Sequence, residues 1–447
     1  MKHSGLITFL MISGLVLGAL FGQYVLFNPD DLIPTNHWTK EVGTLILIRP
    51  LMMLIVPLVF VSVTLAMTTI GDPAKLGLLG GSTLLFYIVT MVCAATLGAI
   101  IVTTFRPGDL PPETRAAMTA RAEADYTASD VVANVEQARK ESKTSMGGAW
   151  MNLFQQLIPT NVVKDMAEGR TLGVIAFAIL FGLALAVGGE PCRPAVAVLE
   201  AAFNAILRMI SWVMWAAPVG VFLLVAASVG RVGLGALSGP LMWFMLIVIG
   251  GVATFGVVVL PAVLLIFGRT NPGRFAWQMR GALLTAFGTA SSSATMPITM
   301  ENCVTEGGCS RRATNFVVPL GATVNMNGTA LFEAVAVIFL CQLYGIDLTF
   351  GEVLIVVMTA ALAAIGAAGI PAAGLVTMVI VIGAVNKALV ARGQPTLPES
   401  AIGVIIGVDR ILDMCRTTLN VWGDMVGAKI MTRLAPDDVE EREKALS

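Results

Sequence analysis

The sequence predicts an all-α polytopic membrane protein. Of its 447 residues, 56% are hydrophobic and only 13% are charged, which is far more apolar than a soluble domain of this length. Apolar runs of spanning length occupy residues 5–27, 44–69, 77–105, 172–188, 195–228 and 236–267, and interrupted apolar segments fill most of residues 281–430. At about 20 residues per span, the chain holds roughly eight or more membrane-embedded elements.

The first apolar run predicts a retained helix, because it is too long for a signal peptide and lacks a small-residue cleavage site. Arginines concentrate in two short connections, at positions 269, 274 and 280 and at positions 311 and 312. By the positive-inside rule both connections face the cytoplasm. We therefore expect a multi-pass protein of a plasma or inner membrane, with both termini cytoplasmic and the polar insert 106–148 extracellular.

Composition also narrows the partners. The net charge is −1 and no basic stripe is present, so we expect no nucleic-acid partner. The chain has six cysteines, of which Cys303 and Cys309 are the closest pair, without His or further Cys at metal-ligand spacing. We interpret them as small buried hydrophobic residues.

The insert 106–148 is the one long polar segment. It mixes both charge signs with Pro, Ser and Ala and has no apolar period. Such a composition predicts a solvated loop.

A pattern repeats in the last third of the chain. The broken segment "TASSSATMP" (289–297) precedes "GATVNMNGTALFEA" (321–334), and the broken segment "AAIGAAGIPAAG" (363–374) precedes "VDRILDMCRTTLNVWGD" (408–424). A hairpin followed by a polar or interrupted helix, twice over, is typical of inverted repeats around a binding site at mid-membrane. The non-helical tips must be buried in protein or line a cavity.

The polar side chains of the last segment form one stripe. With about 100° per residue, the members fall within an arc of roughly 80°; they are Asp409, Asp413, Arg416, Asn420 and Asp424. Arg410 points elsewhere. Each charge costs about 2.5–3.5 kcal/mol at a helix centre, so the stripe is either a structural salt-bridge ladder or a ligand site. In the second case Arg416 suits a carboxylate, Asp413 an amine and Asp424 a small cation.

Two further polar segments have a structural and a functional interpretation. The serines at 291–293 either cap a helix or bind a carboxylate at a hairpin tip. Gly328 is either a packing notch or, beside Asn325 and Asn327, part of an unwound break whose carbonyls coordinate a cation.

Together these segments resemble the glutamate transporter family, the dicarboxylate/amino acid:cation symporters. The similarity is carried by "SSSATMPIT" (291–299), "GATVNMNGTAL" (321–331), "GAAGIPAAG" (366–374) and "DMCRTTLNVWGD" (413–424), with support from "YIVTMVCAATLG" (87–98) and "APVGVF" (217–222). The resemblance implies a homotrimeric elevator-type transporter, and not an enzyme, with eight transmembrane helices and two re-entrant helical hairpins.

The resemblance also implies a division into domains. Helices 1–2 (1–75) and helices 4–5 (149–229) would form a static scaffold. Helix 3 (76–105) and the segment with helices 6 to 8 and both hairpins (230–432) would form the moving transport domain. The insert 106–148 would be an extracellular loop and residues 433–447 a cytoplasmic tail.

Site residues follow by the same resemblance. The substrate-binding set would be Ser291, Ser292, Thr329, Gly369, Ile370, Asp413, Arg416, Thr417 and Asn420. In it Arg416 would bind a side-chain carboxylate, Asp413 the amine, and Asn420 and Ser292 the α-carboxylate. Two sodium sites would use Gly321, Thr323, Asn325, Ala364, Ile365, Ala367, Asn420 and Asp424.

A third cation site of the family is altered here. Tyr87, Thr90 and Asn325 match the family pattern, whereas Met91 replaces a hydroxyl residue and Asn327 replaces the only carboxylate. A buried cation without a countercharge loses attraction, and a thioether is a poor ligand for a hard ion, so we expect this site to be empty or weak. Glu333 occupies the position of an acidic residue in proton-coupled members. It is either a proton carrier, because burial disfavours a charged carboxylate, or a structural hydrogen-bonding residue.

The resulting hypothesis is a symporter of aspartate or glutamate, coupled to sodium and possibly protons, without a cofactor and surrounded by membrane lipid. C4-dicarboxylate and neutral amino acid symporters of the family are the alternatives, and a channel is a further class. An intramembrane protease is disfavoured, since His3 and His37 are the only histidines and "WGD" (422–424) lacks a second glycine.

Overall fold

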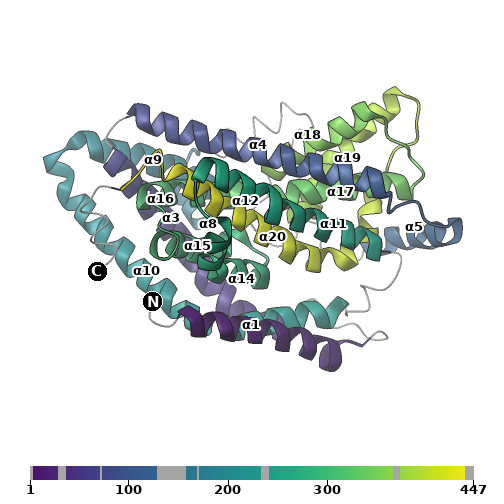
Figure 1. The fold of residues 1–447 in the computed structure, drawn as a ribbon, viewed down its shortest axis with the longest axis horizontal. Coiled ribbons are helices and arrows are strands. Elements are labelled where there is room, and N and C mark those ends of the chain that lie inside the picture. The colour runs from purple at the N-terminus through teal and green to yellow at the C-terminus, as the bar shows by residue number, and fades with distance from the viewer. Residues whose placement is uncertain are drawn as a thin grey trace.

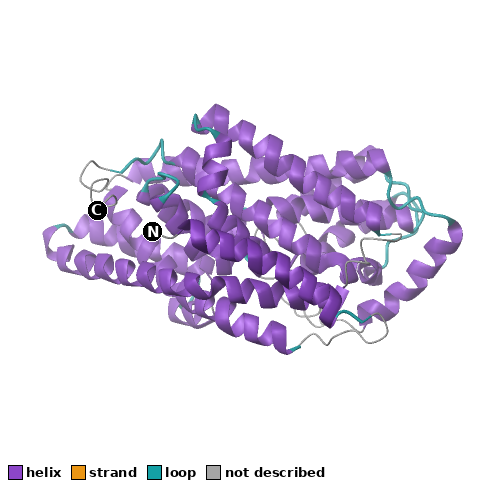
Figure 2. Cartoon of the chain, turned by 60° about the horizontal axis from the view of Figure 1, so that its bottom comes forward, coloured by secondary structure: helices purple, strands orange, loops and turns teal. Residues whose placement is uncertain are grey.

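The computed structural model describes residues 4–28, 37–70, 73–127, 158–168, 171–232, 241–365 and 373–437. Within these ranges every regular element is a helix and no strand occurs. Figures 1 and 2 show the long helices running roughly lengthwise through the molecule, with the start of α1 and the end of α20 toward the same end. The all-helical prediction is confirmed.

The first half of the chain forms long helices separated by short connections. They are α1 (Ser4–Phe21), extended by a π-helical segment (Gly22–Leu26); α2 (Trp38–Gly43) and α3 (Arg49–Ile70), joined by a second π-helical segment (Thr44–Ile48); α4 (Pro73–Phe105); α5 (Pro112–Thr127); α8 (Val162–Glu168); α9 (Thr171–Gly188); and α10 (Arg193–Val232). A short 3-10 turn (Glu190–Cys192) precedes α10.

The second half contains shorter, more polar helices. They are α11 (Met242–Thr254), α12 (Leu260–Val263), α13 (Pro272–Gln278), α14 (Arg280–Thr289), α15 (Ser292–Thr305), α16 (Arg311–Val324), α17 (Asn327–Leu343), α18 (Phe350–Ile365), α19 (Ala373–Ala391) and α20 (Gly403–Met431). Two π-helical segments (Phe255–Val259 and Leu264–Gly268) flank α12, and a 3-10 turn (Glu399–Ile402) leads into α20.

Several helices could cross a bilayer. Six segments of the described chain are long and apolar enough, or up to seven if a bent pair in α10 counts as one span. Helix α20 is not among them, because its charged stripe lowers its hydropathy. These segments make the chain a multi-pass membrane protein, while the expected eight spans and the orientation of the termini stay predictions.

The helices pack into two groups. Helix α1 lies along α10, and α3 packs against α9 and α10. In the other group α4 packs against α17, α20 packs against α14 to α17, and α18 packs against α19. The two groups meet where α3 contacts α15 and α16 and where α14 contacts α1 and α10. The division into scaffold and transport domains and their relative motion stay predictions.

The insert after α4 differs from the sequence expectation. Its first part is helix α5, which packs against α20 and the 3-10 turn before it. A Cβ on Gly403 would lie against the carbonyl of Ala122, so the two backbones touch. Residues 112–127 are therefore not a solvated loop. The contact with α20 stabilises a helix whose own sequence carries no apolar stripe, and residues 128–148 lie outside the described ranges.

The two predicted hairpins differ in how much of each is described. Helices α14 and α15 pack against each other around Ala290, which has a positive φ of 49° and is buried. Ser291 then caps α15 by accepting a hydrogen bond from the amide of Ala294 at 3.1 Å. Helices α18 and α19 form the second pair. The tip between them, residues 366–372, lies outside the described ranges.

Close approach of α1 to α10 depends on three glycines. Gly14, Gly18 and Gly22 lie one turn apart, and a Cβ on them would come within 2.5–2.7 Å of the carbonyl oxygens of Pro218, Phe222 and Ala226, respectively. Apolar helices in a membrane gain little from hydrophobic burial against each other, so small residues that let backbones pack closely stabilise the pair.

We predict that Gly18→Ala destabilises the protein by about 1–3 kcal/mol, because the added methyl group overpacks the interface. The measurement is the melting temperature of the purified protein in detergent. Gly250→Ala in α11 is the matched control, since no atom lies within 4 Å of its added Cβ. An equal effect of both substitutions would contradict the proposed packing.

Candidate functional site

Arg416 is the centre of the polar stripe on α20. Its side chain is 1% exposed, and its Nη2 donates to Asp409 Oδ1 at 2.8 Å and to Asp413 Oδ1 at 2.9 Å. Both carboxylates come from the preceding two turns of the same helix. All three side chains of this charge cluster therefore come from one helix, α20.

Helix α17 covers the cluster. The guanidinium of Arg416 lies 3.7 Å from the ring centroid of Phe332, close enough for a cation–π interaction. A Cβ on Gly328 would lie 2.7 Å from Arg416 Cα, so only glycine lets α17 come this near. Gly328 is thus a packing notch, and Arg416 is held between its own helix and Phe332.

Part of the guanidinium remains available. Arg416 Nε and Nη1 have no hydrogen-bond partner among the described residues. A Cβ on Gly374, in the first turn of α19, would lie 3.7 Å from Nη1 and 3.2 Å from Thr329 Cγ2. Buried N–H groups without partners are costly, so these two donors suit an anion.

The expected bidentate pairing is not open in this geometry. Each two-nitrogen fork of a guanidinium includes Nη2, and Nη2 already donates to two carboxylates. A carboxylate ligand can accept from Nη1 as the site stands. Bidentate binding would require Asp409 or Asp413 to release Nη2.

The helix break predicted at the "NMNGT" segment is confirmed. Helix α16 ends at Val324, α17 begins at Asn327, and Asn325 and Met326 are not helical. Asn420 of α20 spans the break, because its Oδ1 accepts from the amide of Gly328 at 2.6 Å and its Nδ2 contacts Thr329 Oγ1 at 3.4 Å.

Oxygen atoms gather beside this break. Asn325 Nδ2 donates to Asp424 Oδ1 at 2.8 Å, and Asn325 Oδ1 has no partner among the described residues although it is buried. A Cβ on Gly321 would lie against both Asp424 Oδ1 and Tyr87 Oη. A carboxylate, an unpartnered amide oxygen and nearby main-chain carbonyls are the donors that hard cations prefer. The residues fit a small cation such as sodium.

The second expected sodium set is only partly described. Ala364 and Ile365 are buried at the end of α18, and Thr323 is half-buried in the last turn of α16, where its hydroxyl donates to Leu320 O. Ala367, Gly369 and Ile370 lie outside the described residues. The structure therefore does not test this set.

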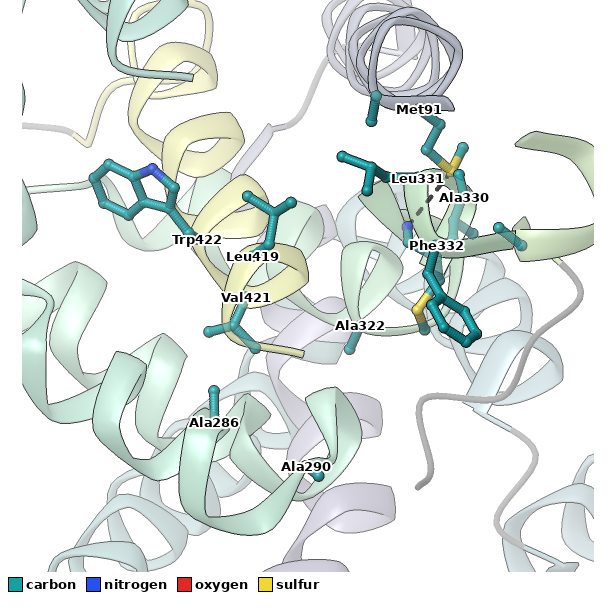
Figure 3. Packing of buried hydrophobic residues seen from close by; sticks show 14 of the residues in the cluster. Met91, Ala286, Ala290, Ala322, Ala330, Leu331, Phe332, Leu419, Val421 and Trp422 are labelled. Carbon is teal, nitrogen blue, oxygen red and sulfur yellow. Dashed lines mark hydrogen bonds between the residues drawn. The ribbon is translucent and has the colours of Figure 1, made fainter. Parts of the chain in front are cut away.

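The altered third site contains an internal bond. Met91 reaches from α4 to the helix break, where its sulfur accepts a hydrogen bond from the amide of Met326 at 3.4 Å (Figure 3). Tyr87 donates to Val317 O at 2.8 Å and Thr90 donates to Phe86 O at 2.8 Å within its own helix. Both polar atoms of the Asn327 side chain lack partners among the described residues.

Glu333 connects α17 to the second hairpin. It is fully buried, and its Oε1 accepts a hydrogen bond from Thr377 Oγ1 of α19 at 2.5 Å. Its Oε2 has no partner in the described part of the chain. Glu333 is therefore compatible with both interpretations from the sequence. One of its oxygens makes a structural hydrogen bond, and the other has an open position.

The other predicted substrate-binding residues in the described part of the chain are Ser291, Ser292 and Thr417. Ser292 and Thr417 are buried, whereas Ser291 is engaged as the cap of α15, as the structural interpretation of these serines expected. The sequence analysis placed Asp409 on the stripe without a partner, and it missed Phe332. The seven-residue spacing from Asp409 to Arg416 could have indicated that these two side chains pair. The contact of Phe332 with Arg416 could not be foreseen, because it depends on the packing of α17 on α20.

Comparisons with known proteins identify the family of the chain. Residues 7–434 match the model of the sodium:dicarboxylate symporter family. The neutral amino acid transporter B(0) of Oryctolagus cuniculus is 35% identical over 89% of this chain and 74% of its own length. Excitatory amino acid transporter 3 of the same species is 32% identical over 96% of this chain and 85% of its own.

Excitatory amino acid transporter 1 of Ambystoma tigrinum is 33% identical over 98% of this chain and 85% of its own length. These relatives are transporters and not enzymes, and they include both acidic and neutral amino acid carriers. The family match covers nearly the whole chain, and the chain belongs to the sodium:dicarboxylate symporter family.

Proposed function

We propose that the protein is a sodium-coupled symporter of acidic amino acids, L-aspartate or L-glutamate. The carrying observation is the buried Arg416, whose Nε and Nη1 lack partners while two carboxylates hold its Nη2. A buried cation with free donors beside a carboxylate suits a ligand that carries both an anionic and a cationic group.

The charges around Arg416 support an amino acid over a simple dicarboxylate. Asp409 and Asp413 place two acidic groups against one guanidinium. A substrate amine near Asp413 would balance the second of them. A dicarboxylate without an amine would instead add negative charge to this cluster, and the like charges would repel each other in a low-dielectric site.

The neutral alternative is favoured by the relatives named neutral amino acid transporter B(0), from Oryctolagus cuniculus, Homo sapiens and Bos taurus, each 35% identical to this chain. The free-energy cost of leaving the buried Arg416 donors unpaired argues against a neutral substrate. A neutral substrate would leave the guanidinium nitrogens Nε and Nη1 without an acceptor, and unpartnered buried donors destabilise the bound state.

The coupling ions are the second part of the proposal. Asp424, Asn325 and Gly321 would hold one sodium ion with Asn420, and Thr323, Ala364, Ile365 and Ala367 a second. The third site would be empty or weak, because the Met91 thioether already accepts the Met326 amide and Asn327 brings no charge. We propose that Glu333 carries a proton instead, because Oε2 is open beside the Thr377 bond.

The elevator motion, the homotrimer and the contact with lipid are proposed from the family resemblance. The described structure supports the first only through its two packing groups. Substrate would bind within the group of α14 to α20, which holds the polar stripe, the helix break and both hairpins.

We predict that Arg416→Ala lowers aspartate affinity by roughly 100-fold or more, since truncating one member of a buried charge cluster costs about 2–5 kcal/mol. The measurement is competition of unlabelled aspartate with labelled aspartate in proteoliposomes. Binding within a few-fold of the parent would show that Arg416 is not the anion site. Binding of a neutral amino acid by the variant would identify the site as the specificity determinant.

A matched pair of variants separates the two carboxylates. Asp413→Asn and Asp409→Asn each remove one charge bonded to the same Nη2. Because only Asp413 is proposed to bind the amine, Asp413→Asn should weaken amino acids and spare succinate, whereas Asp409→Asn should affect both alike. Indistinguishable competition profiles for the two variants would refute the amine assignment.

The coupling proposal predicts a shallow sodium dependence of aspartate affinity, below third order. Glu333→Gln should flatten the pH dependence of uptake, because glutamine cannot exchange a proton. Restoring ligands with Asn327→Asp and Met91→Ser should steepen the sodium dependence. A third-order dependence in the parent, or an unchanged pH profile in Glu333→Gln, would refute this part.

A further inference from the structure

The turn between α15 and α16 brings two cysteines together. Cys303 lies in the last turns of α15 and Cys309 two residues before α16, and both are buried. The amide of Cys309 donates to the carbonyl of Cys303 at 2.9 Å, so the two backbones approach closely here. The chain folds back on itself here through Gly308, which has a positive φ of 58°.

We propose that Cys303 and Cys309 form an oxidisable dithiol whose conversion to an intramolecular disulfide slows transport. Both residues are buried, as the sequence analysis expected, and the proposal adds a chemical role. Disulfides require backbones that approach closely, and the hydrogen bond from the Cys309 amide to the Cys303 carbonyl meets that requirement.

The chemistry needs a two-electron oxidant, for which hydrogen peroxide is the proposed class. One thiol, as its thiolate, attacks a peroxide oxygen and the O–O bond breaks, which leaves a sulfenic acid on that cysteine and releases hydroxide, which takes up the thiol proton to become water. The second thiol then attacks that sulfur, an S–S bond forms, and a second water leaves. The two sulfurs lose two electrons in total, and the peroxide is reduced to two waters.

The turn is attached to the helix that carries the polar stripe. Lys429 Nζ of α20 donates to the carbonyls of Gly307 and Gly308 at 2.8 and 2.9 Å, and the amide of Ser310 donates to Thr432 Oγ1 at 3.0 Å. Because a disulfide restrains this turn, it also restrains the end of α20, and with it the group of helices proposed to move.

The test treats the purified protein in proteoliposomes with hydrogen peroxide, then counts free thiols and searches for a peptide that links Cys303 to Cys309 by mass spectrometry. We expect the linked peptide, a loss of two thiols from this pair, and slower aspartate uptake that dithiothreitol restores. Cys303→Ser and Cys309→Ser should each abolish the linked peptide and the reversible inhibition. Cys341→Ser, which removes a buried cysteine of α17, should retain both.

Phenylarsine oxide, which bridges neighbouring thiols, supplies a second probe of the same pair. It should inhibit the parent and Cys341→Ser but neither serine variant of the pair. The proposal is overturned if no linked peptide forms, or if inhibition persists in Cys303→Ser. The uptake measurement rests on the proposed function, whereas the thiol count and the linked peptide do not, so failure of the substrate assignment would leave the dithiol result intact.

Discussion

The buried guanidinium of Arg416 is the constraint on which the centre of the molecule depends. A charge at this depth is tolerated only with partners, and α20 supplies them at three and seven residues before it, as Asp413 and Asp409. The helix opposite must then come close enough to exclude lipid. Gly328 permits that approach, and Phe332 places an aromatic face on the cation.

The break between α16 and α17 is the second consequence of this packing. An interrupted helix releases backbone groups that lipid cannot satisfy, and neighbouring helices satisfy them here. Asn420 of α20 accepts from Gly328, and Met91 of α4 accepts from Met326. The residues that stabilise the break therefore also border the proposed substrate and cation sites, so a substitution in this region affects folding and binding together.

The sequence predicted the class of fold and the composition of the site because both depend on local patterns. Apolar runs of fixed length predict spans, and a polar stripe with helical period predicts one face of α20. It also predicted the break at Asn325, since two Asn residues beside a Gly at membrane depth favour an interrupted helix. Local patterns do not show which segments far apart in the chain pack against each other.

Four differences illustrate that limit. The contact of α5 with the start of α20 turned an expected loop into a helix, and the hydrogen bond of Met91 to Met326 joins residues separated by 235 positions. The Cys303–Cys309 contact depends on a turn whose geometry the spacing alone did not indicate. The expectation that Arg416 binds a carboxylate bidentately considered the side chain alone. In the structure its Nη2 already donates to Asp409 and Asp413, which prevents that pairing as the site stands.

These contacts suggest how the chain differs from relatives that use more ions. A cation at the third site would need a carboxylate and hard oxygen ligands, and it would hold the break from α4 by electrostatic attraction. Here a methionine holds the same segment by a hydrogen bond to its backbone, and Asn327 carries no charge to balance. An internal bond does not depend on an ion that is captured in each cycle. If the third site is empty, as we propose, Met91 would keep the break ordered without an ion, and the driving force of that ion would have to enter elsewhere. Glu333, buried on the same helix and bonded to Thr377 of the second hairpin, has the open oxygen that a proton could occupy.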